Sequence, residues 1–445
     1  EVPCEVTENG EKDYLYVNAD AVIDPHRPDC AYPYKDLCGA GVAYKFIRHL
    51  YRVMELPWED EDAYMDILAL GTVCDIMPLT DENRIFVKRG LRRLTNSTNL
   101  GINALKKALG LDGKPIEVHH LSFRIGPSLN STGRLESAKE GVELLLTDDP
   151  ARAESLAQDM AKLNELRKEM TDRGVRTATD WVRKDIRMIP TEDGVKEKKI
   201  GDDKVIVLYM PGIHESIAGL IASKLKEAFY RPTLVFTDAE NGQGLKGSGR
   251  SIETYNMFDK LCEHKELFVK VGGHPMAAGF TITREALEPL REALNRDCNL
   301  TDADLVEKLY VDESCAIKQL TLPLYEELAK LEPYGTANAR PLFGIVKMGI
   351  RSIKMVGNEG QYARCTFVDG NGTRINGMVF RGKELLDNIK VWFGDKECDK
   401  ILKGLQNHAL IDILYHMKKN EFNGTVSIQM EPVSIRKSVY YETSK

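Results

Sequence analysis

Residues 271–279 have the sequence VGGHPMAAG, in which two glycines, a histidine and a third glycine interrupt an apolar run. Because glycine has no Cβ, Gly272 and Gly273 can adopt positive φ and let backbone N–H groups come close to a ligand. His274 adds a side-chain donor beside them. The stretch predicts a site for an anion such as phosphate; the alternative is a tight turn with a buried histidine.

A second polar motif lies upstream, where residues 246–251 have the sequence KGSGRS. Ser248 and Arg250 are two residues apart, so in an extended segment both side chains point to the same face. A guanidinium next to a hydroxyl suits phosphate, since arginine binds oxyanions through two parallel hydrogen bonds. Two such motifs in one chain favour a phosphate-binding site over two unrelated turns.

Two further motifs precede these: GTVCDIMPL at residues 71–79 and GPSLNSTGRL at residues 126–135. Together the four motifs resemble the RecJ family, the 5′→3′ exonucleases specific for single-stranded DNA within the DHH phosphoesterase superfamily. The resemblance starts at about Ala21 and continues into the C-terminal region. It implies an α/β fold with a DHH phosphoesterase domain, a long connector helix, a DHH-associated α/β domain and a C-terminal oligonucleotide-binding β-barrel.

The resemblance also implies roles for residues on these motifs. Phosphodiester hydrolysis would use two Mn²⁺ or Mg²⁺ ions, with Asp75 as a catalytic metal ligand and His274 facing the scissile phosphate. Without the family, Asp75 would be interpreted as a helix-terminal or turn aspartate. The implied partners are single-stranded DNA and a helicase or single-strand-binding protein. The substrate phosphate would be bound by Asn130, Arg134, Ser248, Arg250, Gly272, Gly273 and His274.

The sequence departs from the family in its metal ligands. An aspartate-rich motif and the Asp-His-His motif come before this region in the family, whereas His119 and His120 here follow Val118 and lie after Asp75. The opening residues Glu1–Pro3 are similar to the segment directly after Asp-His-His in family members. We therefore expect a fragment that binds single strands weakly and is inactive by itself, because one carboxylate cannot hold two dications.

Length and hydrophobic periodicity predict several domains in the 445 residues. Strand, helix and strand patterns at residues 205–209, 217–229 and 232–236 predict a mainly parallel sheet. Helical patterns cover residues 39–55 and 62–70, where Gly71 can end or bend the helix, and another helix begins at Asp81. We expect the end of the DHH phosphoesterase domain at 1–147, a connector helix at 148–185, the DHH-associated substrate-binding domain at 186–305, and the oligonucleotide-binding fold with its lead-in at 306–445.

The C-terminal region has the pattern of a small β-barrel. Strands are predicted at residues 361–368, 375–380, 409–416 and 426–430, with a tight turn at Asn423-Gly424. Barrels of this kind hold single strands by basic grooves and aromatic stacking. The aromatic residues available for either stacking or the core are Tyr362, Phe367, Phe380, Trp392 and Tyr415.

Charge and composition limit the possible environments. The formal charge is −7, yet residues 344–445 carry a surplus of five positive charges, which suits a DNA-holding part but also a solvated lysine-rich surface. Nine cysteines without zinc spacing, and the lack of an apolar run of membrane length, predict a reduced cytoplasmic protein. Two other functions stay open: a DHH-family phosphodiesterase for short oligonucleotides or cyclic dinucleotides, and a non-catalytic single-strand-binding module.

Overall fold

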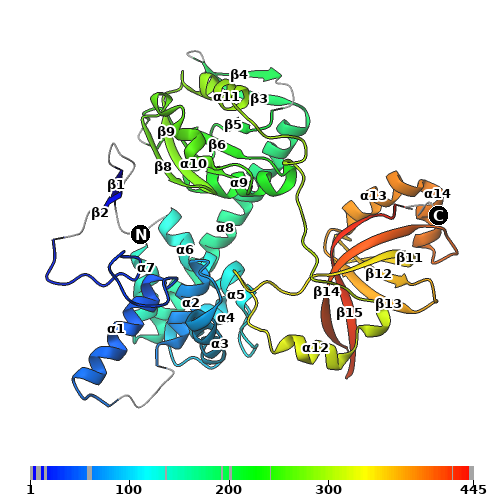
Figure 1. Ribbon diagram of the computed structural model, residues 1–445, viewed down its shortest axis with the longest axis horizontal. Helices are drawn as coiled ribbons and strands as arrows, with labels where there is room; N and C mark the ends of the chain where they lie inside the picture. The colour runs from blue at the N-terminus through cyan, green and yellow to red at the C-terminus, as the bar shows by residue number, and fades with distance from the viewer. Residues whose placement is uncertain are drawn as a thin grey trace. The chain divides into compact units, whose positions relative to one another are not determined.

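The chain separates into two compact units, one of residues 1–93 with 309–445 and one of residues 94–308. Figure 1 shows the helices and strands along the chain, coloured from the N-terminus to the C-terminus. No helix in the part of the chain that can be described is both long and apolar enough to cross a membrane. Every cysteine from Cys30 onward is a free thiol.

The computed structural model describes residues 4–6, 12–14, 18–57, 63–135, 138–191, 194–199, 203–240, 242–422 and 424–439.

The N-terminal part of the first unit is built from three helices. α1 (Gly39–Val53), α2 (Met65–Cys74) and α3 (Asp81–Thr95) follow the short antiparallel pair β1 (Cys4–Val6) and β2 (Lys12–Tyr14). The prediction that a helix ends or bends at Gly71 is wrong, since α2 continues to Cys74. A Cβ at Gly71 would lie 2.9 Å from the Cβ of Ala40 on α1, so the glycine allows these two helices to pack closely. The core of this part contains Leu37, Tyr44, Met65, Leu68 and Phe86.

The C-terminal part of the first unit is a closed five-stranded barrel. Its strand order is β11-β12-β13-β15-β14, and β14 pairs back onto β11. Phe367 and Tyr415 lie fully buried inside it. The predicted turn residue Asn423 lies outside the described residues, and Gly424 has a φ of 74°. The elements are β10 (Glu313–Ser314), η3 (Ile317–Gln319), α12 (Leu322–Ala329), β11 (Phe343–Val356), β12 (Tyr362–Val368), β13 (Arg374–Val379), α13 (Gly382–Phe393), α14 (Asp395–Leu402), β14 (Leu410–Phe422) and β15 (Thr425–Lys437).

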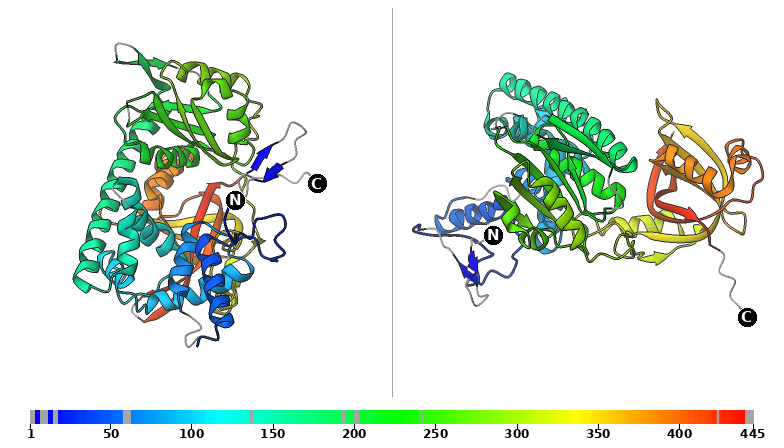
Figure 2. Two further views of the ribbon diagram at one scale, coloured as in Figure 1. Left: turned by 90° about the vertical axis from the view of Figure 1, so that its left-hand side faces the viewer. Right: turned by 90° about the horizontal axis from the view of Figure 1, so that it is seen from above.

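The second unit begins with helices that pack along one long helix, α8 (Pro150–Arg183). Asp149 caps the start of α8 by accepting a hydrogen bond from the Ala151 N–H at 2.9 Å, and Pro150 occupies the first turn, where its missing N–H costs nothing. α8 contacts α4, α6 and α7 as well as α9 and β3 of the sheet region (Figure 2). The preceding elements are α4 (Leu100–Ala108), α5 (Val118–His120), the π-helix η1 (Leu121–Ile125), α6 (Gly126–Leu135) and α7 (Lys139–Leu146).

A five-stranded sheet with the order β5-β6-β7-β9-β8 and a separate antiparallel pair, β3 with β4, lie in the rest of the second unit. The prediction of a mainly parallel sheet is wrong, because only β5 and β6 are parallel and the other three pairings are antiparallel. α9 packs on β6 and β7 on one face, and residues of α10 and α11 join the core on the other. The elements are β3 (Ile186–Thr191), β4 (Gly194–Lys199), β5 (Ile206–Tyr209), α9 (Glu215–Phe229), β6 (Thr233–Asp238), β7 (Leu245–Arg250), α10 (Met257–Cys262), η2 (Lys265–Leu267), β8 (Lys270–His274), β9 (Ala277–Ile282) and α11 (Leu287–Arg296).

Candidate nucleic-acid interface

The KGSGR motif forms strand β7, and its residues alternate between the two faces of the sheet. Gly247 and Gly249 face the core, where a Cβ on Gly247 would lie 2.3 Å from the ring of Phe280. Ser248 and Arg250 point to the other face, as the sequence predicts, and the Arg250 Nη1 donates a hydrogen bond to the Ser248 Oγ at 3.0 Å. The motif therefore places a guanidinium and a hydroxyl within reach of one anion.

The glycine pair lies inside strand β8 rather than in a turn. The chain reverses at Pro275 and Met276, which join β8 to β9. Gly273 has a φ of 157°, and a Cβ there would lie 2.5 Å from the Ala277 carbonyl oxygen, so this position requires glycine. The alternative of a buried histidine is wrong, because His274 is exposed.

The register of the three antiparallel strands aligns the predicted residues in rows. Arg250 pairs with Ala277, which pairs with His274, and Ser248 pairs with Gly279, which pairs with Gly272. Residues paired across a sheet share a face, so Ser248, Arg250, Gly272 and His274 all lie on the face that carries α9. Gly273 lies one residue out of phase, on the opposite face of the sheet, and is exposed there. The structure thus brings four predicted phosphate-binding residues onto one surface.

Two glycines leave the middle of this face open. No heavy atom lies within 4 Å of the position a Cβ would take at Gly272 or at Gly279, so a ligand can approach the backbone there. On α9, a Cβ at Gly219 would lie 2.9 Å from both the Arg250 Nη2 and the Ser248 Oγ. Sequence reasoning missed Gly219 because helical periodicity does not indicate which strand residues lie beneath a helix.

The predicted residues Asn130 and Arg134 belong to α6. Asn130 is exposed, and the side chain of Arg134 lies outside what can be described. α6 is joined to α8 by buried polar contacts: the Asn164 Nδ2 donates to the Ser128 Oγ at 3.1 Å, and the Ser131 hydroxyl contacts the Met160 carbonyl oxygen at 3.3 Å. These contacts fix the orientation of the helix that carries the two candidates.

Asp75 lies at the C-terminal end of α2, in the other unit, and its side chain is exposed. A carboxylate is unfavourable at this end of a helix, where the peptide dipoles already concentrate negative charge. The next residue, Ile76, has a φ of 57°, a strained conformation for a β-branched side chain. Burial, together with the charge of Asp75, raises the pKa of the neighbouring Cys74 thiol to about 11. The Ile76 and Met77 N–H groups donate to the carbonyl oxygens of Val73 and Thr72, so Asp75 lies in a helix-terminal turn, and its role as a metal ligand stays a prediction.

The described residues do not form a metal site by themselves. Among them, no group of three or more His, Cys, Asp or Glu side chains lies close enough together to hold a metal ion. Within the same part of the chain, Asp75 makes no ion pair with Lys or Arg. The described residues therefore do not by themselves supply the several oxygen ligands that a two-metal site needs.

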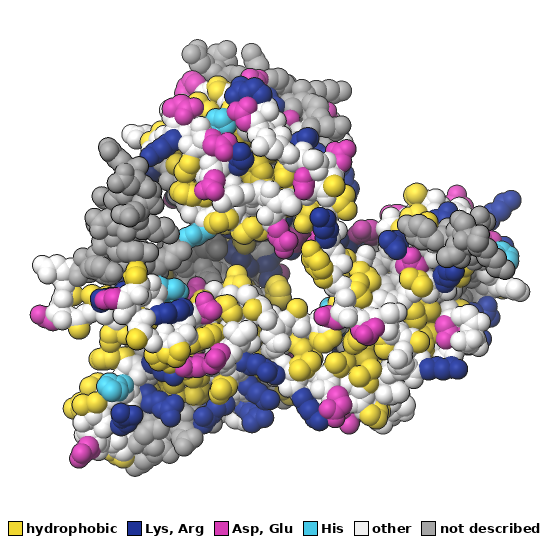
Figure 3. All heavy atoms as spheres, viewed as in Figure 1, with side chains coloured by type: hydrophobic (Ala, Val, Ile, Leu, Met, Phe, Trp, Pro, Cys, Tyr) yellow, Lys and Arg dark blue, Asp and Glu magenta, His cyan; other side chains and the backbone are white. Residues whose placement is uncertain are grey.

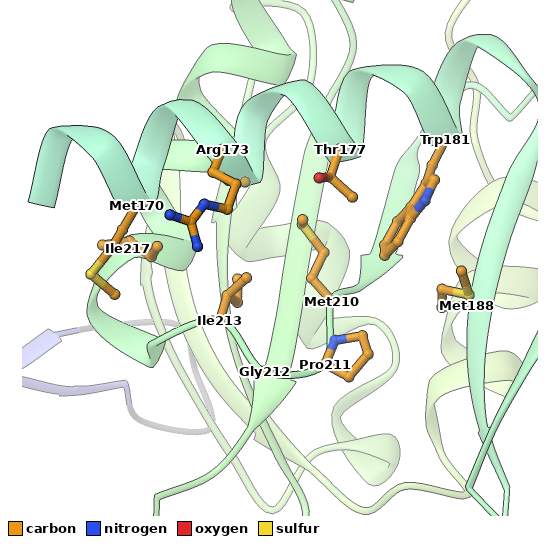
Figure 4. A pocket seen from close by; sticks show the side chains of 11 residues that line it. Met170, Arg173, Thr177, Trp181, Met188, Met210, Pro211, Gly212, Ile213 and Ile217 are labelled. Atoms are coloured by element: carbon orange, nitrogen blue, oxygen red, sulfur yellow. The ribbon is translucent and has the colours of Figure 1, made fainter.

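A pocket of about 640 Å³ lies elsewhere in the second unit, between α8 and the loop after β5 (Figure 4). Met170, Arg173 and Trp181 reach into it from α8, opposite Met210 and Ile213. None of the predicted phosphate-binding residues lines this pocket, so it is separate from the polar face of β7, β9 and β8.

The barrel offers exposed aromatic residues as well as buried ones. Phe367 and Tyr415 belong to the core, whereas Phe380 is 52% exposed and packs edge-on against Tyr362, with ring centroids 5.8 Å apart. On the face of the barrel seen in Figure 3, apolar side chains are exposed among basic ones. Phe380 and Tyr362 are therefore one exposed aromatic pair of the barrel, and Trp392, edge-on to Phe393, is partly exposed as well.

Comparison with known proteins agrees with this architecture. Residues 202–299 match the model of the DHHA1 domain, and residues 311–433 match that of the RecJ OB domain. The single-stranded-DNA-specific exonuclease RecJ of Bacillus subtilis is 33% identical over 83% of this chain and 44% of its own length. The Dickeya dadantii protein of the same name is 31% identical over 93% of this chain and 69% of its own length. A crystal structure of RecJ in complex with Mg²⁺ from Thermus thermophilus superposes with a TM-score of 0.72 and 26% identity, covering 93% of this chain and 57% of that one.

The DHHA1 match and the closed oligonucleotide-binding barrel define a protein of the DHH phosphoesterase superfamily. Within that superfamily, the chain belongs to the RecJ family. It spans less than half the length of the Bacillus subtilis relative.

Proposed function

We propose that this chain holds single-stranded DNA for 5′→3′ exonucleolytic hydrolysis of its phosphodiester bonds, in DNA repair and recombination. The observation that carries the proposal is the face of β7, β9 and β8, where Ser248, Arg250 and His274 surround glycines that leave room for a ligand. The Arg250 guanidinium would bind two phosphate oxygens, and the Ser248 hydroxyl would donate to a third. The names of the relatives support single-stranded DNA as the substrate.

The proposed metal is Mg²⁺ or Mn²⁺, since Thermus thermophilus RecJ has been crystallised with each of them. Such ions supply Lewis-acid catalysis and a nucleophile from water. The described residues do not by themselves form a two-metal site, and Asp75 is proposed as one of the ligands that would hold such an ion. We expect the 445-residue chain to bind a single strand without hydrolysing it.

Asn130 and Arg134 on α6 are proposed as further contacts to the phosphate at the end of the strand. The barrel, with its exposed Phe380, would hold the strand by stacking. A helicase or a single-strand-binding protein is proposed as a partner. The match to the RecJ OB domain disfavours a phosphodiesterase for cyclic dinucleotides.

The test is a binding and hydrolysis assay on one 5′-phosphorylated single-stranded oligonucleotide with Mn²⁺. Arg250→Gln should weaken binding by at least about 10- to 100-fold, because each charge-assisted hydrogen bond of the guanidinium contributes about 1.5–3 kcal/mol. Arg176→Gln, which changes an exposed arginine of α8, should leave binding unchanged. Equal binding of single-stranded and duplex DNA would contradict the proposal. If the chain releases nucleotides and Asp75→Ala abolishes this release, the expected inactivity is wrong.

A further inference from the structure

The polar face of β7, β9 and β8 continues one row beyond the residues described above. Lys246 pairs with Thr281, and Thr281 pairs with Lys270. Each of the three lies two residues along its strand from the Ser248, Gly279 and Gly272 row, so all point to the same face. The face therefore consists of three rows, with a lysine at each end of the third.

The two lysines differ in their surroundings. Lys246 forms an ion pair with Glu215, the first residue of α9. Lys270 is exposed, and within the part of the chain that can be described it has no ion pair or hydrogen bond from its side chain. Among the described residues, its positive charge is therefore not neutralised by a neighbouring carboxylate.

The spacing of the rows suits a chain of phosphates. Two residues of a β-strand span about 7 Å, which is comparable to the step between phosphates in an extended single strand. Between the outer rows, Gly272 and Gly279 present no side chain. A nucleic-acid backbone can lie across these glycines without meeting a Cβ.

We propose that Lys270, with Lys246 and Thr281, binds the phosphate next to the one held by Ser248 and Arg250. The strand then runs along the direction of β8 and β9, over the floor formed by Gly272 and Gly279. This inference rests on the proposed function and adds the path of the DNA across the sheet.

The experiment measures binding of a 5′-phosphorylated single-stranded oligonucleotide by the full chain at several salt concentrations. Each phosphate contact to a single strand contributes about 0.7 to the slope of log K against log salt. Lys270→Gln should reduce the magnitude of this negative slope by about 0.7 and weaken binding about fivefold at about 0.1 M salt. Gly279→Val should weaken binding while the melting temperature is kept, because the Cβ position is open to solvent.

Lys162→Gln is the matched control, since it removes the same charge from an exposed position on α8 and should leave the slope unchanged. Suppose that Lys270→Gln has the same salt slope as the unmodified chain while Arg250→Gln has a smaller one. This result would overturn the inference about Lys270 and leave the proposed function standing. If the unmodified chain binds no single strand at any salt concentration, the proposed function itself fails.

Discussion

Gly219 offers a way to disturb the proposed phosphate site without touching a residue of the site itself. It is buried in the interior of α9, above Ser248 and Arg250. In Gly219→Ala, the new Cβ would lie 2.9 Å from the Arg250 Nη2 and 2.9 Å from the Ser248 Oγ. Non-bonded contacts need about 3.5 Å, so both groups must move by roughly 0.5 Å.

This displacement should separate stability from binding. Alanine is favoured over glycine in a helix interior by about 0.8–1 kcal/mol, and the groups that must move are the flexible ends of side chains. The melting temperature should therefore stay the same or rise. Binding needs the guanidinium and the hydroxyl held to within about 0.5 Å, so the loss of one charge-assisted hydrogen bond, about 1.5–3 kcal/mol, is expected. Affinity for a single strand should fall about 10- to 100-fold.

The assay pairs fluorescence anisotropy of a labelled single strand with a thermal melt of the same preparation. Gly141→Ala in α7 is the control, because its Cβ would meet only the Leu129 carbonyl oxygen, at 3.8 Å. Gly141→Ala should gain the same helix-propensity stabilisation of about 0.8–1 kcal/mol without changing the affinity for a single strand. Unaltered affinity in Gly219→Ala would refute the role given to Ser248 and Arg250, and a large fall in melting temperature would refute the packing argument.

The barrel, the end of α2 and the α6–α8 contact each give a further prediction. Phe380→Ala should weaken binding of a thymidine oligonucleotide by about 1–3 kcal/mol in an anisotropy titration. Val391→Ala, which also shortens an exposed side chain, should leave binding unchanged. Equal effects of the two changes would exclude stacking on Phe380. The pKa of the Cys74 thiol is raised from 9.0 to about 11, so the unfolded chain loses this proton at a lower pH than the folded one, and the free energy of unfolding should fall between pH 9 and 11. If Cys74→Ala shows the same fall, the fall does not come from this thiol. Asn164→Leu should lower the free energy of unfolding, measured in urea, by about 2 kcal/mol because the buried hydrogen bond to Ser128 is lost. A loss below about 0.5 kcal/mol would show that the position of α6 does not depend on this hydrogen bond.

Local patterns in the sequence predicted many of the elements. The polar segment at residues 148–185 forms α8 within two residues at each end, because a long amphipathic pattern with a capping aspartate and a proline has few alternatives. The alternation in KGSGR correctly placed Ser248 and Arg250 on one face. Both predictions depend only on contacts between residues close in the sequence.

Features that depend on long-range pairing could not be predicted in this way. β11 (Phe343–Val356) carries register shifts in its pairings with β12 and β14, which break the alternation of apolar residues, and it was missed. The prediction of a mainly parallel sheet was wrong because the strand, helix and strand at β5, α9 and β6 say nothing about the antiparallel strands β7, β8 and β9 that follow them. Lys270 was missed for the same reason, since only the pairing of β8 with β9 brings it next to Thr281.

The antiparallel register is what makes the proposed interface a single surface. Residues of β7 and of the β8–β9 hairpin meet there only because Ser248 lies opposite Gly279 and Gly279 lies opposite Gly272. A slip of one residue in either pairing would turn the partner strand over, so that Phe280 or Ala278 would face the ligand and the open glycine positions would face the core. The buried ring of Phe280, which fits over Gly247, opposes such a slip. The packing of the core on one face of the sheet thus fixes the arrangement of polar groups on the other, and this explains why the motif alternates glycine with serine and arginine.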